Sequence, residues 1–291
     1  MENTRASPIT TSRNLLGNSF DFSQTDLSDL EKMLPELRED EANGEIAAIF
    51  ADIRDTMGIP KVNLIYRYFA TIDGALPEIW RFLRPYFVQR RIENAVGEFT
   101  QLLSPAALKH YKLPPQQLDH EEREAIVATL DFYLRANPMN LCALQLLALG
   151  IDYNFRVQHD VPSLLNADEL KRSLRTSRFE HQVDELMYAV SQGAEHIRPT
   201  LLRDLRRWPN YLDKISPMIR SICIDQDFFS RTHNVYDAAM LKSHSMHDGE
   251  PVMLTSTASK EILAFCQYFP ILLIRMTMIA DILRRGTVFR R

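Results

Sequence analysis

The sequence predicts an all-α protein, and three observations support this prediction. Nine glycines among 291 residues are few for a β protein rich in hairpins. No stretch shows the sustained alternation of apolar and polar residues that a half-buried strand requires. Apolar residues instead recur three or four positions apart over most of the chain, which is the spacing of amphipathic helices.

The first half of the chain is predicted to hold a series of such helices. One covers residues 45–57, EIAAIFADIRDTM, whose isoleucines and Phe50 share one stripe. A longer amphipathic helix is expected from Glu78 to about Leu103. Another spans residues 119–135 and opens with acidic residues, which stabilise the positive end of the helix dipole. We expect Asn137-Pro138 to break it before a further helix begins.

Helical patterning returns after a polar interval. Residues 159–178 have few large apolar side chains apart from short leucine clusters, and are predicted to form a linker. Helical segments are then expected at 183–190, 199–208, 210–223 and 259–285.

The two halves echo each other. A shift of 136 residues sets Arg67 on Arg203 and Leu76 on Leu212, and the order of helices and proline-bearing turns is the same in both halves. We therefore predict two fused, related helical repeats that form a pseudo-dimer, with the candidate site between the halves. The expected boundaries are a polar N-terminal extension at 1–41, a first repeat at 42–158, a linker at 159–178 and a second repeat at 179–291.

Composition and charge exclude several classes of function. The formal charge is −4 and basic and acidic residues are interleaved, so no nucleic-acid-binding face is expected. The longest apolar run, residues 262–274, contains a glutamine and a proline and ends at Arg275, so no membrane span is expected. The first 24 residues are polar and lack the apolar core of a signal peptide. A cytoplasmic protein fits these features.

No metal or cofactor is predicted. The three cysteines are far apart and form no C-x-x-C pair, which argues against a zinc or dithiol centre. The stretch from His244 to Asp248, HSMHD, offers two histidines but is predicted to be a loop without a nearby third ligand. Glycine-rich phosphate loops, G-x-S-x-G and H-E-x-x-H are all missing from the sequence.

Four stretches carry a resemblance to a known family. They are GEIAAIFADIRDTMGIP, ATIDGALPEIWR, the ANP of residues 136–138 and RRWPNYL. Together they resemble the configuration-nonspecific (group I) 2-haloacid dehalogenases over roughly Gly44 to Ile282. The resemblance implies an all-helical fold of two fused repeats. It also implies a hydrolase in which an aspartate activates water to displace halide from a short 2-haloacid.

The resemblance places the catalytic aspartate, preceded by a serine, seven residues before the Trp-Pro pair. This sequence has Thr200 and Leu201 there. A leucine cannot accept a proton, so the chain is predicted to be a diverged member that lacks the catalytic aspartate. Asn137 matches a family asparagine that helps to hold the water.

The other pocket positions also differ from the family. Lys61 and Leu64 stand where the family has a tryptophan and a phenylalanine, and the family's pocket tyrosine falls near Cys266 and Tyr268. Asp204, one helical turn after Leu201, is a candidate replacement base, although it could instead pair with Arg203 or Arg207. Lys61 could bind a substrate carboxylate as a point charge or be simply solvated.

The sequence also leaves the function open between classes. One hypothesis is a dehalogenase-like hydrolase that is inactive or altered because of Leu201. Alternatives are a small-carboxylate-binding protein without dehalogenase activity and a helical interaction scaffold; an alkylhydroperoxidase-like protein is disfavoured by the missing C-x-x-C. Arg67 and Arg203 could flank an anion between the halves or form ion pairs on helix surfaces. A small carboxylic acid is the expected partner, and a homodimer is left open.

Overall fold

The computed structural model describes residues 34–103, 111, 114, 117–153, 155, 164–178, 181–194 and 198–288. Within these ranges the chain is helical and has no strand, which confirms the all-α prediction. The helices are α1 (Gly44–Met57), α2 (Leu64–Phe69), α3 (Ala75–Val88), α4 (Arg91–Leu103), α5 (His120–Ile151), α6 (Ala167–Thr176), α7 (Gln182–Val190), α8 (Thr200–Leu205), α9 (Pro209–Cys223), α10 (Gln226–Met246) and α11 (Ser256–Val288).

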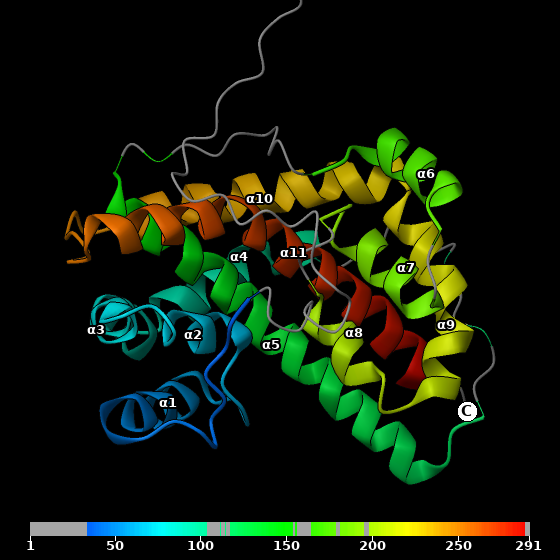
Figure 1. Cartoon of the computed structure of the whole chain (residues 1–291), viewed down its shortest axis with the longest axis horizontal. Coiled ribbons are helices and arrows are strands. Elements are labelled where there is room, and N and C mark those ends of the chain that lie inside the picture. The colour runs from blue at the N-terminus through cyan, green and yellow to red at the C-terminus, as the bar shows by residue number, and fades with distance from the viewer. Residues whose placement is uncertain are drawn as a thin grey trace, which may run out of the picture.

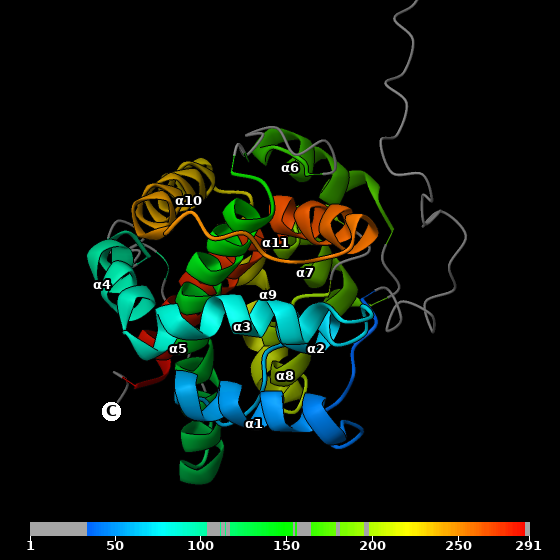
Figure 2. The ribbon, with the colours of Figure 1, turned by 90° about the vertical axis from the view of Figure 1, so that its left-hand side faces the viewer.

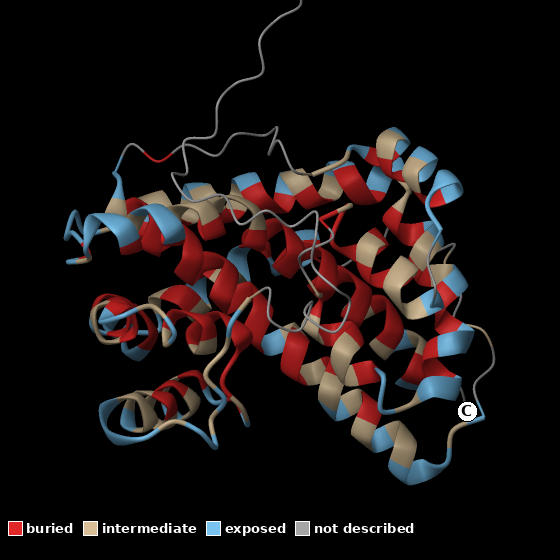
Figure 3. Cartoon of the chain, viewed as in Figure 1, coloured by how far each residue is buried: buried red, intermediate tan, exposed pale blue. Residues whose placement is uncertain are grey.

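Two long helices form the centre of the fold. α5 has 32 residues and α11 has 33, and these two helices make the most extensive helix–helix contact of the molecule. All residues of α5 from Ala136 to Gly150 are buried, as are those of α11 from Phe269 to Ala280 (Figure 3). Such uniformly buried stretches are expected where a helix is surrounded by others on every side.

The remaining helices surround this pair. α1, α2 and α3 lie on one side of the molecule, and α7, α8 and α9 lie on the other (Figure 1). α10 crosses back to pack on α4 and α5, which Figure 2 shows from the side. The lengths of α2 and α8, of α3 and α9, and of α5 and α11 are nearly equal and follow the same order. A duplicated chain would have this arrangement, and the duplication itself stays a prediction.

The helix starts and stops follow their local sequence. α5 begins with a capping box, in which Asp119 accepts the Glu122 backbone N–H at 2.8 Å and the Glu122 side chain returns to the N-cap. α1 ends at Gly58, whose φ of 61° lies in the left-handed region that favours glycine. These signals were readable in the sequence.

Two predicted helix boundaries were wrong. The helix expected from Glu78 to Leu103 is divided into α3 and α4 at Gln89 and Arg90, where Arg90 has a φ of 58°. In contrast, α5 continues through Pro138, where a break was expected. The buried packing on both sides of Pro138 outweighs the loss of one backbone hydrogen bond.

Two other segments are more helical than predicted. The segment 159–178, predicted as a linker, contains α6, whose capping box joins Asn166 and Glu169. The part of that segment at 159–163 lies outside the described residues, as does most of the predicted extension at 1–41. His244 belongs to the last turn of α10, so the loop predicted at 244–248 begins only at His247.

One described helix, α11, is long and apolar enough to cross a membrane by length and composition. Most of its apolar window, 78%, is buried inside the protein. The core helix of a soluble protein passes the same test, so this helix is weak evidence for a membrane span.

Candidate functional site

α8 carries the residues at which the resemblance places the catalytic group. Leu201, Leu202 and Leu205 of this short helix are fully buried, with no exposed surface. Leu201 therefore packs as a core side chain. Thr200 and Asp204, one turn apart on the same helix, remain only partly buried.

A polar cluster joins α8 to residues from the first half of the chain. Lys61, which precedes α2, forms an ion pair with the Oδ2 atom of Asp204. The hydroxyl group of Tyr133, on α5, donates a hydrogen bond of 2.7 Å to the same oxygen atom. The Lys61 ammonium also lies 4.7 Å from the centre of the Phe132 ring, within cation–π range. We refer to Lys61, Tyr133 and Asp204 as the Asp204 cluster.

The members of the Asp204 cluster differ in their burial. The Asp204 side chain is 13% exposed, whereas that of Lys61 is 42% exposed. Burial, followed by the negative charge of Asp204, holds the pKa of Tyr133 well above its usual value, so the hydroxyl stays protonated and donates. Asp204 is thus paired, as the sequence suggested, but its partners come from across the fold and not from Arg203 or Arg207.

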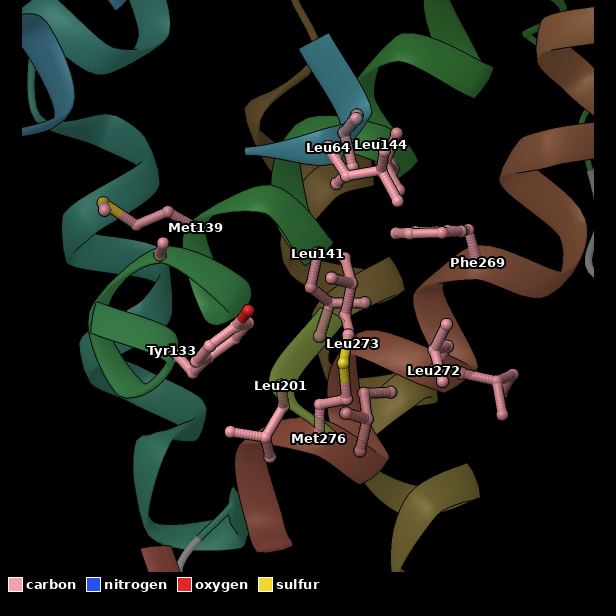
Figure 4. Packing of buried hydrophobic residues seen from close by; sticks show 14 of the residues in the cluster. Leu64, Tyr133, Met139, Leu141, Leu144, Leu201, Phe269, Leu272, Leu273 and Met276 are labelled. Atoms are coloured by element: carbon pink, nitrogen blue, oxygen red, sulfur yellow. The ribbon is translucent and has the colours of Figure 1, made fainter. Parts of the chain in front are cut away.

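Apolar side chains from four helices belong to the core on which α8 packs. In Figure 4, Leu201 lies toward Met276, Leu64 lies beside Leu144, and Leu141 lies between these two pairs. Leu64 is 9% exposed and the other four are at most 1% exposed. The Thr200 hydroxyl lies 3.9 Å from the sulfur of Met276. Two of the predicted pocket residues, Leu64 and Leu201, are therefore core residues in this structure.

Asn137 lies one turn after Tyr133 on α5 and is 1% exposed. Its Nδ2 atom has no hydrogen-bond partner among the described residues, and neither amide atom of the neighbouring Asn140 has one. Buried amides normally have a partner, and an ordered water molecule often provides it. Asn137 shares a face of α5 with Tyr133, and its role at the site stays a prediction.

Cys266 and Tyr268 lie on α11 in an aromatic group. The Tyr268 ring is 5.8 Å from the ring of Phe265, which stacks on Tyr68 of α2 at 4.9 Å. Burial raises the pKa of the Cys266 thiol, so it is protonated at neutral pH and a poor nucleophile. Cys266 is a core residue, with 1% exposure.

Arg67 and Arg203, which the sequence related by the 136-residue shift, meet on one carboxylate. Arg67 Nη2 lies 2.9 Å from Oε2 of Glu36, and Arg203 donates a hydrogen bond of 2.9 Å to Oε1 of the same residue. The predicted anion between these arginines is thus a side chain of the protein itself.

The described residues contain no group of three or more histidine, cysteine, aspartate or glutamate side chains that could hold a metal ion. His244 and His247 are separated by the end of α10, and burial lowers the pKa of His247. Within the described part of the chain, these two histidines therefore belong to no such group of metal ligands.

Sequence reasoning missed Tyr133 and Glu36. Tyr133 lies four residues before Asn137, so helical spacing placed it on the same face, but nothing in the sequence linked it to Asp204. Glu36 lies in an acidic stretch without helical periodicity, and its pairing depends on tertiary structure alone.

The chemistry open to the site follows from these contacts. Displacing a halide with water requires an ionised carboxylate with a free acceptor position near the water. Leu201 offers none, and the buried oxygen of Asp204 already accepts from an ammonium and a hydroxyl group. The exposed part of Lys61 can still attract a further anion.

Comparison with known proteins supports the fold. No protein-family model and no curated protein sequence matches the chain. Among solved structures, a D-2-haloacid dehalogenase mutant with D-2-CPA superposes with a TM-score of 0.67 and 17% identity, covering 88% of this chain and 96% of that chain. A D-2-haloacid dehalogenase with L-LA gives the same TM-score and coverage at 15% identity. The chain therefore has the fold of the D-2-haloacid dehalogenases.

Proposed function

We propose that the protein binds a short 2-substituted carboxylic acid between its two halves, and that it does not displace halide from this acid by hydrolysis. It is then a dehalogenase-like protein with altered activity. The observation that carries this proposal is the pairing of Lys61 with Asp204 on α8, the helix in which Leu201 is fully buried.

The fold, and the ligands present in two structurally similar proteins, support the proposal that this protein binds a small acid. Two structurally similar proteins are D-2-haloacid dehalogenases that were solved with D-2-CPA and with L-LA. Lys61 is a cation at the contact between α8 and the segment before α2, and its side chain remains 42% exposed. A carboxylate can therefore approach the ammonium from the solvent side while Asp204 holds the inner side.

Catalysis is lost because neither candidate base, Leu201 or Asp204, can activate the water. Leu201 has no proton acceptor and fills its space with hydrocarbon. Asp204 lies one helical turn, roughly 5 Å, further along α8, and a reacting group displaced by about 1 Å can already cost two orders of magnitude in rate. Its carboxylate is also engaged by Lys61 and Tyr133.

Isothermal titration calorimetry with each enantiomer of 2-chloropropionate tests the binding. We expect saturable binding by the wild type and at least tenfold weaker binding by Lys61→Met. Lys214→Met is the matched control, because Lys214 is exposed on α9 and its substitution removes the same charge from a residue outside the cluster. Equal binding by wild type and Lys61→Met would place the ligand elsewhere.

A helical interaction scaffold is the second candidate, and the apolar packing around Leu201 favours it. If wild type binds neither enantiomer, the small-acid proposal fails and the scaffold is the better description.

A further inference from the structure

Arg67 and Arg203 form a second cationic site, separate from Lys61. Arg67 belongs to α2 and Arg203 to α8, so the two guanidinium groups come from different halves of the chain. Among the ion pairs of the described residues, Glu36 is the carboxylate that both of them reach. The Glu36 side chain is 20% exposed and that of Arg67 is 17% exposed, whereas that of Arg203 is 39% exposed, so the contact is shielded from water on the Arg67 side.

A single carboxylate leaves this pair of arginines incompletely satisfied. Two guanidinium groups carry two positive charges, and Glu36 supplies one negative charge. Arg67 approaches Glu36 at 2.9 Å, but its buried Nε atom and the Oε2 atom of Glu36 have no hydrogen-bond partner among the described residues. Arginine binds carboxylates best through two parallel hydrogen bonds, and the position of Glu36 does not provide them to Arg67.

Glu36 reaches the arginines from an extended segment that crosses the first half. The Leu37 backbone N–H donates to the Arg67 carbonyl at 3.1 Å, and Glu39 accepts from the Val62 backbone N–H at 2.7 Å. Glu39 also forms an ion pair with Arg54 of α1, and residues 34–42 themselves lie outside any helix. Glu36 is therefore a carboxylate that the chain itself holds at the two arginines, as a covalently attached ligand would be held.

We propose that Arg67 and Arg203 form a binding site for a short-chain carboxylate, and that Glu36 occupies this site as an internal competitor. A free carboxylate is not restrained by the chain, so it can align with both guanidinium groups. Residues 34–42 then act as a displaceable strap over the site. This proposal does not depend on ligand binding at Lys61.

Propionate is the appropriate probe, because it reproduces the end of a glutamate side chain. Titration calorimetry at pH 7 should show at least tenfold tighter propionate binding to Glu36→Gln than to wild type, since a tethered competitor acts at a high effective concentration. Glu45→Gln is the matched control, with the same chemical change at an exposed position on α1, and should bind propionate as wild type does. No gain in Glu36→Gln would overturn the proposal.

Two further variants separate this site from the one at Lys61. Adding Arg203→Gln to Glu36→Gln should abolish the gained binding, whereas adding Lys61→Met should leave it intact. If Lys61→Met removes the gain and Arg203→Gln does not, the propionate binds in the Asp204 cluster and the arginine site is refuted.

Wild-type protein provides a readout even if Glu36→Gln fails to fold. Displacement of Glu36 by propionate should release the hydrogen bond of the Leu37 amide. Hydrogen exchange at this amide should therefore become at least tenfold faster in saturating propionate than in sodium chloride of equal ionic strength. An unchanged exchange rate would show that Glu36 is a permanent structural contact.

Discussion

The Tyr133 hydroxyl donates a hydrogen bond of 2.7 Å to the Asp204 carboxylate, although 71 residues separate the two in sequence. Tyr133 lies on a central helix and Asp204 on the short α8, so this bond, together with the Lys61 ion pair, fixes α8 against the first half of the chain. Asp204 is therefore expected to contribute to stability.

Asp204→Asn should lower the free energy of unfolding by about 1 to 3 kcal/mol, because it removes a charged partner from Lys61 and weakens the bond from Tyr133. Urea denaturation measures this change. Asp213→Asn is the matched control, since Asp213 is exposed on α9 and its loss should change stability by at most about 0.5 kcal/mol. Equal stability of both variants would show that the Asp204 cluster contributes nothing to the fold.

Arg275 is a second expected determinant of stability. It is fully buried in α11 and donates hydrogen bonds to the carbonyls of Ala189 and Val190, at the end of α7, and of Cys223, at the end of α9. A cation at the carboxyl ends of two helices is favoured by their dipoles.

Arg275→Met should therefore destabilise the protein by about 3 to 5 kcal/mol or prevent folding, because three buried carbonyls each lose a charged donor. Thermal unfolding followed by circular dichroism measures the loss. Arg206→Met, at an exposed position, should be nearly neutral. A loss below about 1 kcal/mol for Arg275→Met would contradict the capping role.

Two glycines within helices are expected to respond in opposite directions to substitution by alanine. A Cβ atom at Gly150 would lie 2.7 Å from Phe82 Cζ and 2.8 Å from Val252 Cγ2, whereas one at Gly97 meets nothing within 4 Å. Gly150→Ala should cost about 1 to 3 kcal/mol through overpacking. Gly97→Ala should stabilise the protein by about 0.5 to 1 kcal/mol, because alanine favours the helix. Chemical denaturation of the pair checks both signs, and a stabilised Gly150→Ala would refute the packing of α5 against α3.

Buried tyrosines should give the protein a distinct alkaline titration. Burial raises the pKa of Tyr66, Tyr133 and Tyr236 in the folded state. The contribution of these neutral tyrosines to the free energy of unfolding is therefore fully present below pH 10, and it is lost as the pH rises above 10. Absorbance at 295 nm should show fewer than the ten tyrosines titrating near pH 10 in the native protein, and all ten doing so in guanidinium chloride. Titration of all ten near pH 10 with an unchanged circular dichroism spectrum would contradict their burial.

The sequence predicted the helical class and most helix positions because apolar spacing and capping residues are local signals. Gly58 and Asp119 ended and began helices as expected. Pro138 misled the prediction, since its effect depends on the packing that surrounds it, and α10 was missed because its apolar residues are interrupted by polar ones.

The candidate site was predictable only in part. The absence of a carboxylate at position 201 is a fact of sequence, and the relation between Arg67 and Arg203 was visible in the 136-residue shift. Their shared partner, Glu36, and the convergence of Lys61 and Tyr133 on Asp204 are products of tertiary structure. No local pattern in a single sequence records such contacts between distant segments.

The most direct test of the central claim is halide release from both enantiomers of 2-chloropropionate, measured for wild type, Asp204→Asn and Leu201→Asp. We predict no release above the uncatalysed background by the first two proteins, because neither has a free carboxylate at the required position. Leu201→Asp supplies that carboxylate and should release halide if it folds. Sustained release by wild type that is lost in Asp204→Asn would contradict the account, because it would make Asp204 the working base.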